Sequence, residues 1–226
     1  MPRERNTSNF TGLFPEWLMC SALSKSIKAN KDHLGNLRFH IDDKTTKLSG
    51  FFPNISEAEL KPDQPLLKTE FDKWGIKKEL YQKTYWGLRP DFMVINEKDK
   101  TNLILIEAKC GVFIPDSTWK NPKEMKYYEF LEAVEEYDNR ALLYIVPREK
   151  VRNCLECIKL FDKKRNDLRV GYGIWEEMLE FMVDSINNEF IEWLGYQCEG
   201  IQMLSQWRRE QHNRPSVTEV APIKAL

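Results

Sequence analysis

Three charged side chains lie at the ends of two neighbouring apolar runs. Asp91 directly precedes the run FMVI, and Glu107 and Lys109 follow the run LILI. The polar segment NEKDKTN joins the two runs, and this pattern predicts the two strands of a hairpin. Four consecutive apolar residues are typical of an internal strand, and a charged face on such a strand is typical of a functional cleft. Taken singly, these residues also fit a strand entry after proline and a surface ion pair.

Asp91 can meet Glu107 in only one register of this hairpin. Side chains alternate across a strand, so Glu107 and Lys109 share one face while Ala108 takes the other. A register in which paired residue numbers sum to 198 places Asp91 opposite Glu107. It leaves Lys98 to Lys100 as the loop. A slip of one residue would move Asp91 to the wrong face.

Two carboxylates in this register would have Cβ atoms roughly 4.5–5.5 Å apart and would repel each other. They are tolerated if one is protonated or if a divalent cation lies between them, and oxygen-only ligands suit Mg²⁺ or Mn²⁺. Such an ion polarises a phosphoryl oxygen and lowers the pKa of a bound water, which is the chemistry of phosphodiester hydrolysis. Lys109 could orient or deprotonate that water and stabilise the charged transition state.

These residues resemble the signature of the PD-(D/E)xK nuclease superfamily. Pro90 and Asp91 match its first half, and Glu107-Ala108-Lys109 matches its second half. The order of expected elements from about residue 11 to 147 is also similar: a helix, three strands, a helix and a strand. The resemblance implies a restriction-endonuclease-like fold in which Asp91, Glu107 and the Ala108 carbonyl bind the metal and Lys109 acts on the water.

The superfamily often adds an acidic residue from its first helix, and Glu16 is the candidate here. A carboxylate near a helix N-terminus is equally expected from the helix dipole. The chain departs from the RecB-like branch because its next expected helix contains tyrosines but no glutamine. Lys120, Lys123 and Lys126 in the first turn of that helix could contact a phosphate backbone, although a lysine run is more often a solvated face.

Periodicity predicts an α/β fold with a central mixed β-sheet flanked by helices. We expect a nuclease core over residues 1–150, with an insertion at about 31–74, and an αβα extension over 151–226 that packs on the core. The expected helices are residues 11–30, 120–139, 148–167 and 175–196. The expected strands are residues 77–87, 91–95, 103–112, 140–147 and 168–175.

Composition limits the classes of function. The 226 residues carry a net charge of −1, so bulk electrostatics cannot bind nucleic acid and any such contact must be local. Five cysteines, an odd number without regular spacing, indicate reduced thiols and a cytoplasmic location, and we expect Cys154 and Cys157 to be core thiols rather than a metal pair. No run approaches the ~20 apolar residues of a membrane span.

The sequence therefore predicts a Mg²⁺-dependent deoxyribonuclease acting in restriction, repair or defence against phage. The alternative is a catalytically inactive relative that binds nucleic acid or a partner protein. RNA stays open as a substrate because the metal site acts on the phosphodiester rather than on the base or sugar. Because double-strand cutting by this fold commonly needs two active sites, the aromatic-rich C-terminal helices are a candidate homodimer interface.

Overall fold

The computed structural model describes residues 8–80, 88–109, 123–162 and 168–182, and gives only the backbone of residues 8–17, 123, 124, 160 and 162. The chain divides into two units, Met1–Ile186 and Asn187–Leu226. All described residues belong to the first unit.

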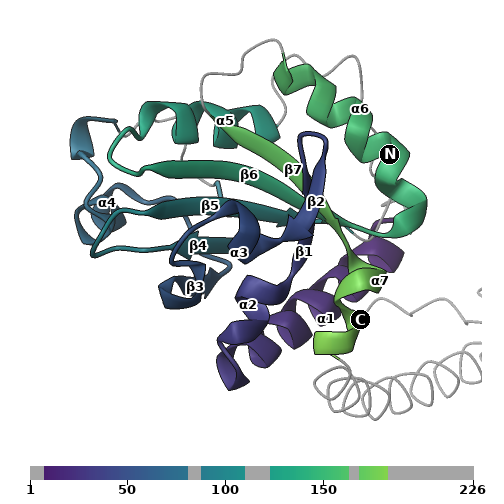
Figure 1. Cartoon of the computed structure of the whole chain (residues 1–226). Helices are drawn as coiled ribbons and strands as arrows, with labels where there is room; N and C mark the ends of the chain where they lie inside the picture. Colours follow the sequence, from purple (N-terminus) through teal and green to yellow (C-terminus); the bar gives the residue numbers. More distant parts are fainter. Residues whose placement is uncertain (1–7, 81–87, 110–122, 163–167, 183–226) are drawn as a thin grey trace, which may run out of the picture. The chain divides into compact units, whose positions relative to one another are not determined.

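A single mixed sheet of seven strands forms the centre of this unit (Figure 1). Its strands follow the spatial order β2-β1-β7-β6-β5-β4-β3. β5, β6 and β7 are parallel to one another, and the remaining neighbours pair antiparallel. The strands are β1 (Arg38–Ile41), β2 (Lys44–Lys47), β3 (Glu59–Pro62), β4 (Phe92–Ile95), β5 (Asn102–Ala108), β6 (Asn139–Val146) and β7 (Arg169–Ile174).

Helices cover both faces of the sheet, which confirms the predicted α/β class (Figure 1). One apolar core lies between the sheet and α4, α5 and α6. A second core lies between the sheet and α1, α2, α3 and α7. The helices are α1 (Ser8–Ala29), α2 (Asp32–Asn36), α3 (Leu48–Phe51), α4 (Lys68–Trp74), α5 (Lys123–Ala133), α6 (Val151–Asp162) and α7 (Trp175–Met178).

Strand alternation distributes the side chains of the central strands between the two cores. All seven residues of β5 are buried, as expected for a strand with helices on both sides. Leu103 and Leu105 belong to the core beneath α4, α5 and α6, whereas Ile104 and Ile106 belong to the core of α1, α2, α3 and α7. Odd-numbered residues of β5 therefore face α5 and α6.

The segment that we expected to form an insertion, residues 31–74, contributes three strands to the sheet. β1 and β2 form one edge through the pairing of β1 with β7, and β3 forms the other edge beside β4. β3 also occupies the place that we had assigned to a strand over residues 77–87. Lys78–Leu80 is a short 3-10 helix instead, and residues 81–87 lie outside the described ranges.

The part of the expected C-terminal extension that the structure describes belongs to the same sheet. α6 and β7 confirm the predicted helix and strand, and β7 lies between β6 and β1. The long helix expected from residue 175 begins as the four-residue α7, which continues into the 3-10 turn Leu179–Phe181. The remainder of that helix and the proposed dimer interface lie outside the described residues.

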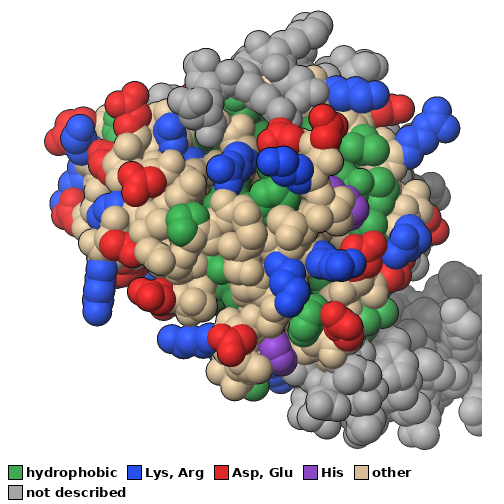
Figure 2. Space-filling view, in the orientation of Figure 1, with side chains coloured by type: hydrophobic (Ala, Val, Ile, Leu, Met, Phe, Trp, Pro, Cys, Tyr) green, Lys and Arg blue, Asp and Glu red, His purple; other side chains and the backbone are tan. Residues whose placement is uncertain are grey.

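Charged side chains of both signs are interspersed on the face shown in Figure 2. This agrees with the near-zero net charge of −1 and with local rather than bulk recognition of any charged ligand. Among the described residues, there is no helix with the length and apolar character needed to span a membrane.

Candidate active site

Asp91 lies opposite Glu107, in the register expected from the sequence. β4 pairs antiparallel with β5 from Phe92 opposite Ile106 to Ile95 opposite Leu103, and one step beyond Phe92 sets Asp91 against Glu107. Asp91 and Glu107 also form the type of cross-strand pair in which the two side chains are closest. Asn96 N–H donates to the Asn102 carbonyl at 3.0 Å, so even-numbered residues of β4 and β5 form the hydrogen-bonded pairs. Asp91 and Glu107 therefore form a non-hydrogen-bonded pair.

The two residues face α5 and α6 together with Lys109. Glu107 shares the odd-numbered face of β5 with Leu103 and Leu105, and Asp91 is its cross-strand neighbour on that face. The Lys109 ammonium lies 2.5 Å from Glu107 Oε1. The structure therefore brings all three sequence-predicted charges to one side of the sheet.

The Glu107 side chain is almost fully buried, with 3% of its surface exposed, while 23% of Lys109 is exposed. A buried carboxylate is unfavourable unless a cation and hydrogen bonds compensate for its lost hydration. Lys109 supplies that cation from the solvent side. On the other side, Tyr144 of β6 lies directly opposite Glu107 in the parallel register and is itself buried, so it limits the directions open to the carboxylate.

The Asp91 carboxylate caps the end of β5. Ala108 N–H donates to Asp91 Oδ2 at 2.7 Å. In the register of β4 and β5, the residue opposite Ala108 is Pro90, and a hydrogen-bonded pair directs both the N–H and the carbonyl of a residue at its partner strand. Pro90 has no N–H to donate. The ladder of β4 and β5 therefore provides no donor for the Ala108 carbonyl.

A third acidic residue, Asp63, lies next to Asp91 on the β3 side, away from Glu107. Asp63 N–H donates to the Asp91 carbonyl at 2.9 Å, which extends the pairing of β3 with β4 by one residue. Asp63 Oδ2 accepts from Arg89 Nη1 at 3.1 Å. Asp63, Asp91 and Glu107 thus follow one another in register at the ends of β3, β4 and β5, and the two outer members of this row pair with Arg89 and Lys109.

Sequence reasoning missed Asp63 and Arg89. Pro62-Asp63 repeats the dipeptide of Pro90-Asp91, but β3 is only four residues long and none of its residues is fully buried, so no apolar run marked it as a strand. Knowledge that β3 neighbours β4 would have identified both residues.

Two carboxylates of this row, Asp91 and Glu107, and the neighbouring Ala108 carbonyl are the oxygen atoms that could hold a metal ion. Within the described ranges, no three His, Cys, Asp or Glu side chains converge closely enough to hold a metal. Mg²⁺ usually takes one or two protein carboxylates and completes its shell with waters and substrate phosphates. Asp91, Glu107 and the Ala108 carbonyl fit that requirement with oxygen donors alone.

The remaining candidates have mixed outcomes. Glu16 lies in α1, but its side chain is outside the described residues; the described half of α1 packs on the opposite face of the sheet, through Ala22, Leu23 and Ile27. Lys120 lies outside the described ranges, and only the backbone of Lys123 is described, as the first residue of α5.

Lys126 is half-buried on α5. Its neighbour Tyr127 accepts a hydrogen bond from the Arg89 N–H at 3.2 Å. The part of α5 around Tyr127 therefore lies close to Arg89, two residues before Asp91.

Cys154 and Cys157 are buried thiols that form no disulfide, and both belong to the core, as predicted. Burial is the main cause that raises the pKa of the Cys154 thiol. A buried thiol with a raised pKa is a poor nucleophile and a poor metal ligand.

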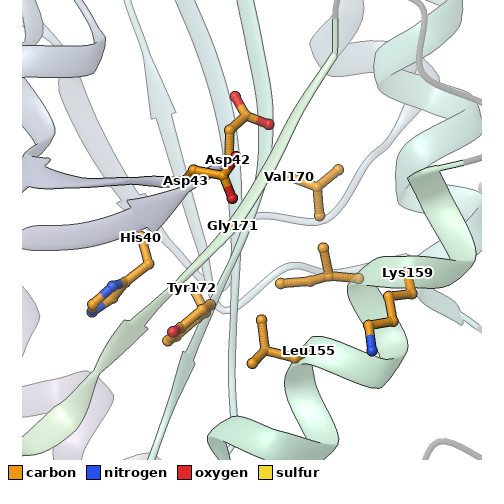
Figure 3. Close-up of a pocket in the computed structure, with 9 residues that line it drawn as sticks. His40, Asp42, Asp43, Leu155, Lys159, Val170, Gly171 and Tyr172 are labelled. Atoms are coloured by element: carbon orange, nitrogen blue, oxygen red, sulfur yellow. The ribbon is translucent and has the colours of Figure 1, made fainter.

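A separate cavity of about 320 Å³ lies between β1, β7 and α6 (Figure 3). The His40 and Tyr172 rings stack there at 4.6 Å between centroids, and the acidic turn of Asp42 and Asp43 forms another part of the wall. Tyr172, Tyr144 and Glu107 follow one another in register across β7, β6 and β5, so the buried Tyr144 separates this cavity from the row of carboxylates.

No family model, curated protein or solved structure matches the chain.

Proposed function

We propose that the chain is a metal-dependent nuclease that hydrolyses phosphodiester bonds of DNA. The observation that carries the proposal is the cross-strand pair of Asp91 and Glu107, with the Lys109 ammonium 2.5 Å from Glu107 Oε1. Sequence spacing alone required one particular register to bring these groups together, and β4 and β5 have that register.

The order of the elements supports the same proposal. β3, β4 and β5 form an antiparallel set, α5 follows, and β6 returns parallel to β5. This is the order that the resemblance to the PD-(D/E)xK superfamily implies, with the aspartate at the start of the second strand and the glutamate and lysine at the end of the third. This agreement in order supports the proposal.

In this proposal, Asp91, Glu107 and the Ala108 carbonyl hold Mg²⁺ or Mn²⁺. The bound ion supplies Lewis-acid activation of a phosphoryl oxygen and of a water. When Glu107 is a metal ligand, the Lys109 ammonium is released from its carboxylate and can donate hydrogen bonds to the attacking water and to a phosphoryl oxygen. The buried Tyr144 restricts the Glu107 side chain from the β6 side.

One observation favours the alternative, a catalytically inactive subunit that binds nucleic acid or a partner. Glu107 is paired with Lys109, and Asp91 caps the Ala108 amide. Each charge therefore also has a structural role that needs no metal. Cleavage by the purified protein decides between the two functions.

The test is a cleavage assay on linear, circular and single-stranded DNA and on RNA, with Mg²⁺, Mn²⁺ or EDTA. We expect metal-dependent cleavage by the wild type and its loss in Lys109→Ala. Lys73→Ala is a matched control because Lys73 also pairs with a nearby glutamate, Glu70, at 3.0 Å, but on the exposed surface of α4. Full activity of Lys109→Ala, or no cleavage by a folded wild type with either metal, would rule out this active site.

A further inference from the structure

We infer that Arg89 binds a phosphate of the nucleic-acid backbone beside the site of cleavage, and that Asp63 holds the guanidinium until the phosphate displaces it. This inference rests on the proposed function, because it assigns a substrate contact to the same row of residues.

The backbone of Arg89 is fixed while its side chain is accessible. Its N–H donates to the hydroxyl of Tyr127, a fully buried residue of α5. The preceding residue, Leu88, is buried and accepts a hydrogen bond from Leu66 N–H at 2.9 Å. In contrast, 54% of the Arg89 side chain is exposed. A guanidinium on a rigid base and open to solvent is suited to capture a phosphate with little loss of conformational freedom.

Asp63 places this guanidinium next to the active-site pair. Asp63 lies directly across from Asp91, and Arg89 precedes Asp91 by two residues, about 6–7 Å along an extended chain. The Arg89 guanidinium therefore lies to one side of the carboxylate pair rather than between its members. That position suits a phosphate that neighbours the reacting one.

A substrate phosphate can replace Asp63 as the partner of the Arg89 guanidinium. Asp63 is 70% exposed and Arg89 is 54% exposed, and ion pairs in such surroundings contribute little because water competes for both groups. Arginine binds phosphate through two parallel, charge-assisted hydrogen bonds. A polyanion that approaches Asp91 and Glu107 meets repulsion, and Arg89 is a cation positioned to offset it. Lys109 is less accessible, with 23% of its side chain exposed.

The two partners should respond to mutation in opposite directions. Arg89→Ala removes the phosphate contact, and we expect it to weaken DNA binding about 5- to 10-fold and to lower the slope of log Kd against log salt by about 1. Asp63→Asn removes the competing carboxylate, and we expect it to tighten binding about 2- to 5-fold. If the pair only fastened the end of β3 to β4, both variants would weaken binding or leave it unchanged.

Binding would be measured by fluorescence anisotropy with a labelled DNA oligonucleotide in Mg²⁺, in the full-length chain carrying Lys109→Ala so that the probe stays intact. Arg152→Ala is the control, because Arg152 of α6 also pairs with a carboxylate, Glu156, at 3.9 Å and is 90% exposed. We expect no change from it. Thermal melting confirms that each variant is folded. Arg89→Lys keeps the positive charge but loses the paired N–H donors of the guanidinium, and it should bind DNA with intermediate affinity.

The outcomes separate this inference from the proposed function. If the wild type cleaves DNA but Arg89→Ala and Asp63→Asn bind as the parent does, the inference is wrong and the nuclease assignment stands. If no metal supports cleavage but the two variants shift binding in opposite directions, the phosphate contact stands and the chain is a binding subunit. Tighter binding by Arg89→Ala, or weaker binding by Asp63→Asn, overturns the inference in either case.

Discussion

Asp91 accepts a 2.7 Å hydrogen bond from the backbone N–H of Ala108, at the position where β4 and β5 separate. Pro90 lies opposite Ala108 in the register, and it leaves the Ala108 carbonyl without a ladder donor. The Asp91 side chain thus satisfies the amide of Ala108 while its charge remains beside Glu107. The same two residues combine a structural cap with the proposed binding of a cation.

Asp91→Asn should keep the hydrogen bond that caps Ala108 N–H but remove the negative charge beside Glu107. The Asn oxygen can still accept from Ala108 N–H, so we expect stability within about 1 kcal/mol of the wild type, but a loss of cleavage of about 10²-fold or more. Asp91→Ala should lose cleavage and also about 1–3 kcal/mol, because it leaves the N–H of the fully buried Ala108 without an acceptor. Urea denaturation and the cleavage assay measure both effects. Equal stabilities of the two variants would contradict the cap, and full activity of Asp91→Asn would contradict the metal site.

Lys109→Ala should destabilise the fold through Glu107. The variant leaves a carboxylate that is 3% exposed without its ammonium, and we expect a loss of about 1–3 kcal/mol, less than for a fully buried pair because Lys109 borders solvent. Glu107→Gln in the same chain should recover most of that loss. Mg²⁺ should raise the Tm of Lys109→Ala more than that of the double variant, because the ion replaces the missing cation only where the carboxylate remains.

A double-mutant cycle with and without Mg²⁺ measures this coupling. Lys73→Ala should cost little and should show no added dependence on Mg²⁺, since Lys73 is 66% exposed and its partner Glu70 is 23% exposed, against 3% for Glu107. Equal responses of Lys109→Ala and of the Lys109→Ala/Glu107→Gln double variant to Mg²⁺ would argue against an ion at Glu107.

The register of β4 and β5 could be predicted from the sequence because two constraints agreed. Each strand carries an apolar run long enough to mark its position, and the polar segment between them is short enough to fix the pairing. The observed partners, such as Phe92 with Ile106, follow that register. The internal strands β6 and β7 and the helix α6 were predictable for the same reason, since burial imposes a regular apolar pattern on them.

The sheet edges could not be predicted in this way. β2 has no buried residue, and β3 has none either, so neither strand shows the apolar alternation that marks a half-buried strand. We expected a strand over residues 77–87, yet Lys78–Leu80 forms a 3-10 helix. Pairing with distant neighbours, rather than local preference, decides which of such segments join a sheet. Asp63 was missed because its strand was missed.

Gly171→Ala should detach β1 from the sheet. A Cβ at Gly171 would lie 2.4 Å from the His40 backbone oxygen and 2.6 Å from Ile41 Cγ1, and the backbone atom cannot move without breaking the pairing of β1 with β7. We expect a loss of more than about 2 kcal/mol. Gly35→Ala is the control, since its nearest neighbour would be Ile55 Cγ2 at 3.4 Å.

Hydrogen exchange would show whether the loss comes from the edge of the sheet. The amides of β1 should lose protection in Gly171→Ala, while those of β4 and β5 keep it. Unchanged stability of this variant would contradict the assignment of residues 38–41 to the sheet.

Alkaline pH should destabilise the fold through Tyr137. Burial is the main cause that raises the pKa of this phenol, whereas an unfolded tyrosine titrates near a pKa of about 10. Above about pH 10 the unfolded chain therefore loses a proton that the folded chain keeps, and the free energy of unfolding falls by up to about 1.4 kcal/mol per pH unit for this group. Burial lowers the pKa of Lys100, so the folded chain releases this proton at a lower pH than the unfolded chain does. The free energy of unfolding therefore rises with pH for this group, but only up to the pKa of an unfolded lysine, about 10.4.

Tyr137→Phe should make the decline between about pH 10.5 and 11.5 shallower, because phenylalanine has no proton to release. The variant loses the 2.5 Å hydrogen bond from the Tyr137 hydroxyl to the Trp74 carbonyl, which Lys100 Nζ also contacts at 2.5 Å. Its stability at neutral pH should therefore fall by about 1 kcal/mol, while its pH dependence becomes weaker. Urea denaturation across this pH range measures both quantities, and equal slopes for the variant and the wild type would show that Tyr137 does not titrate between the two states.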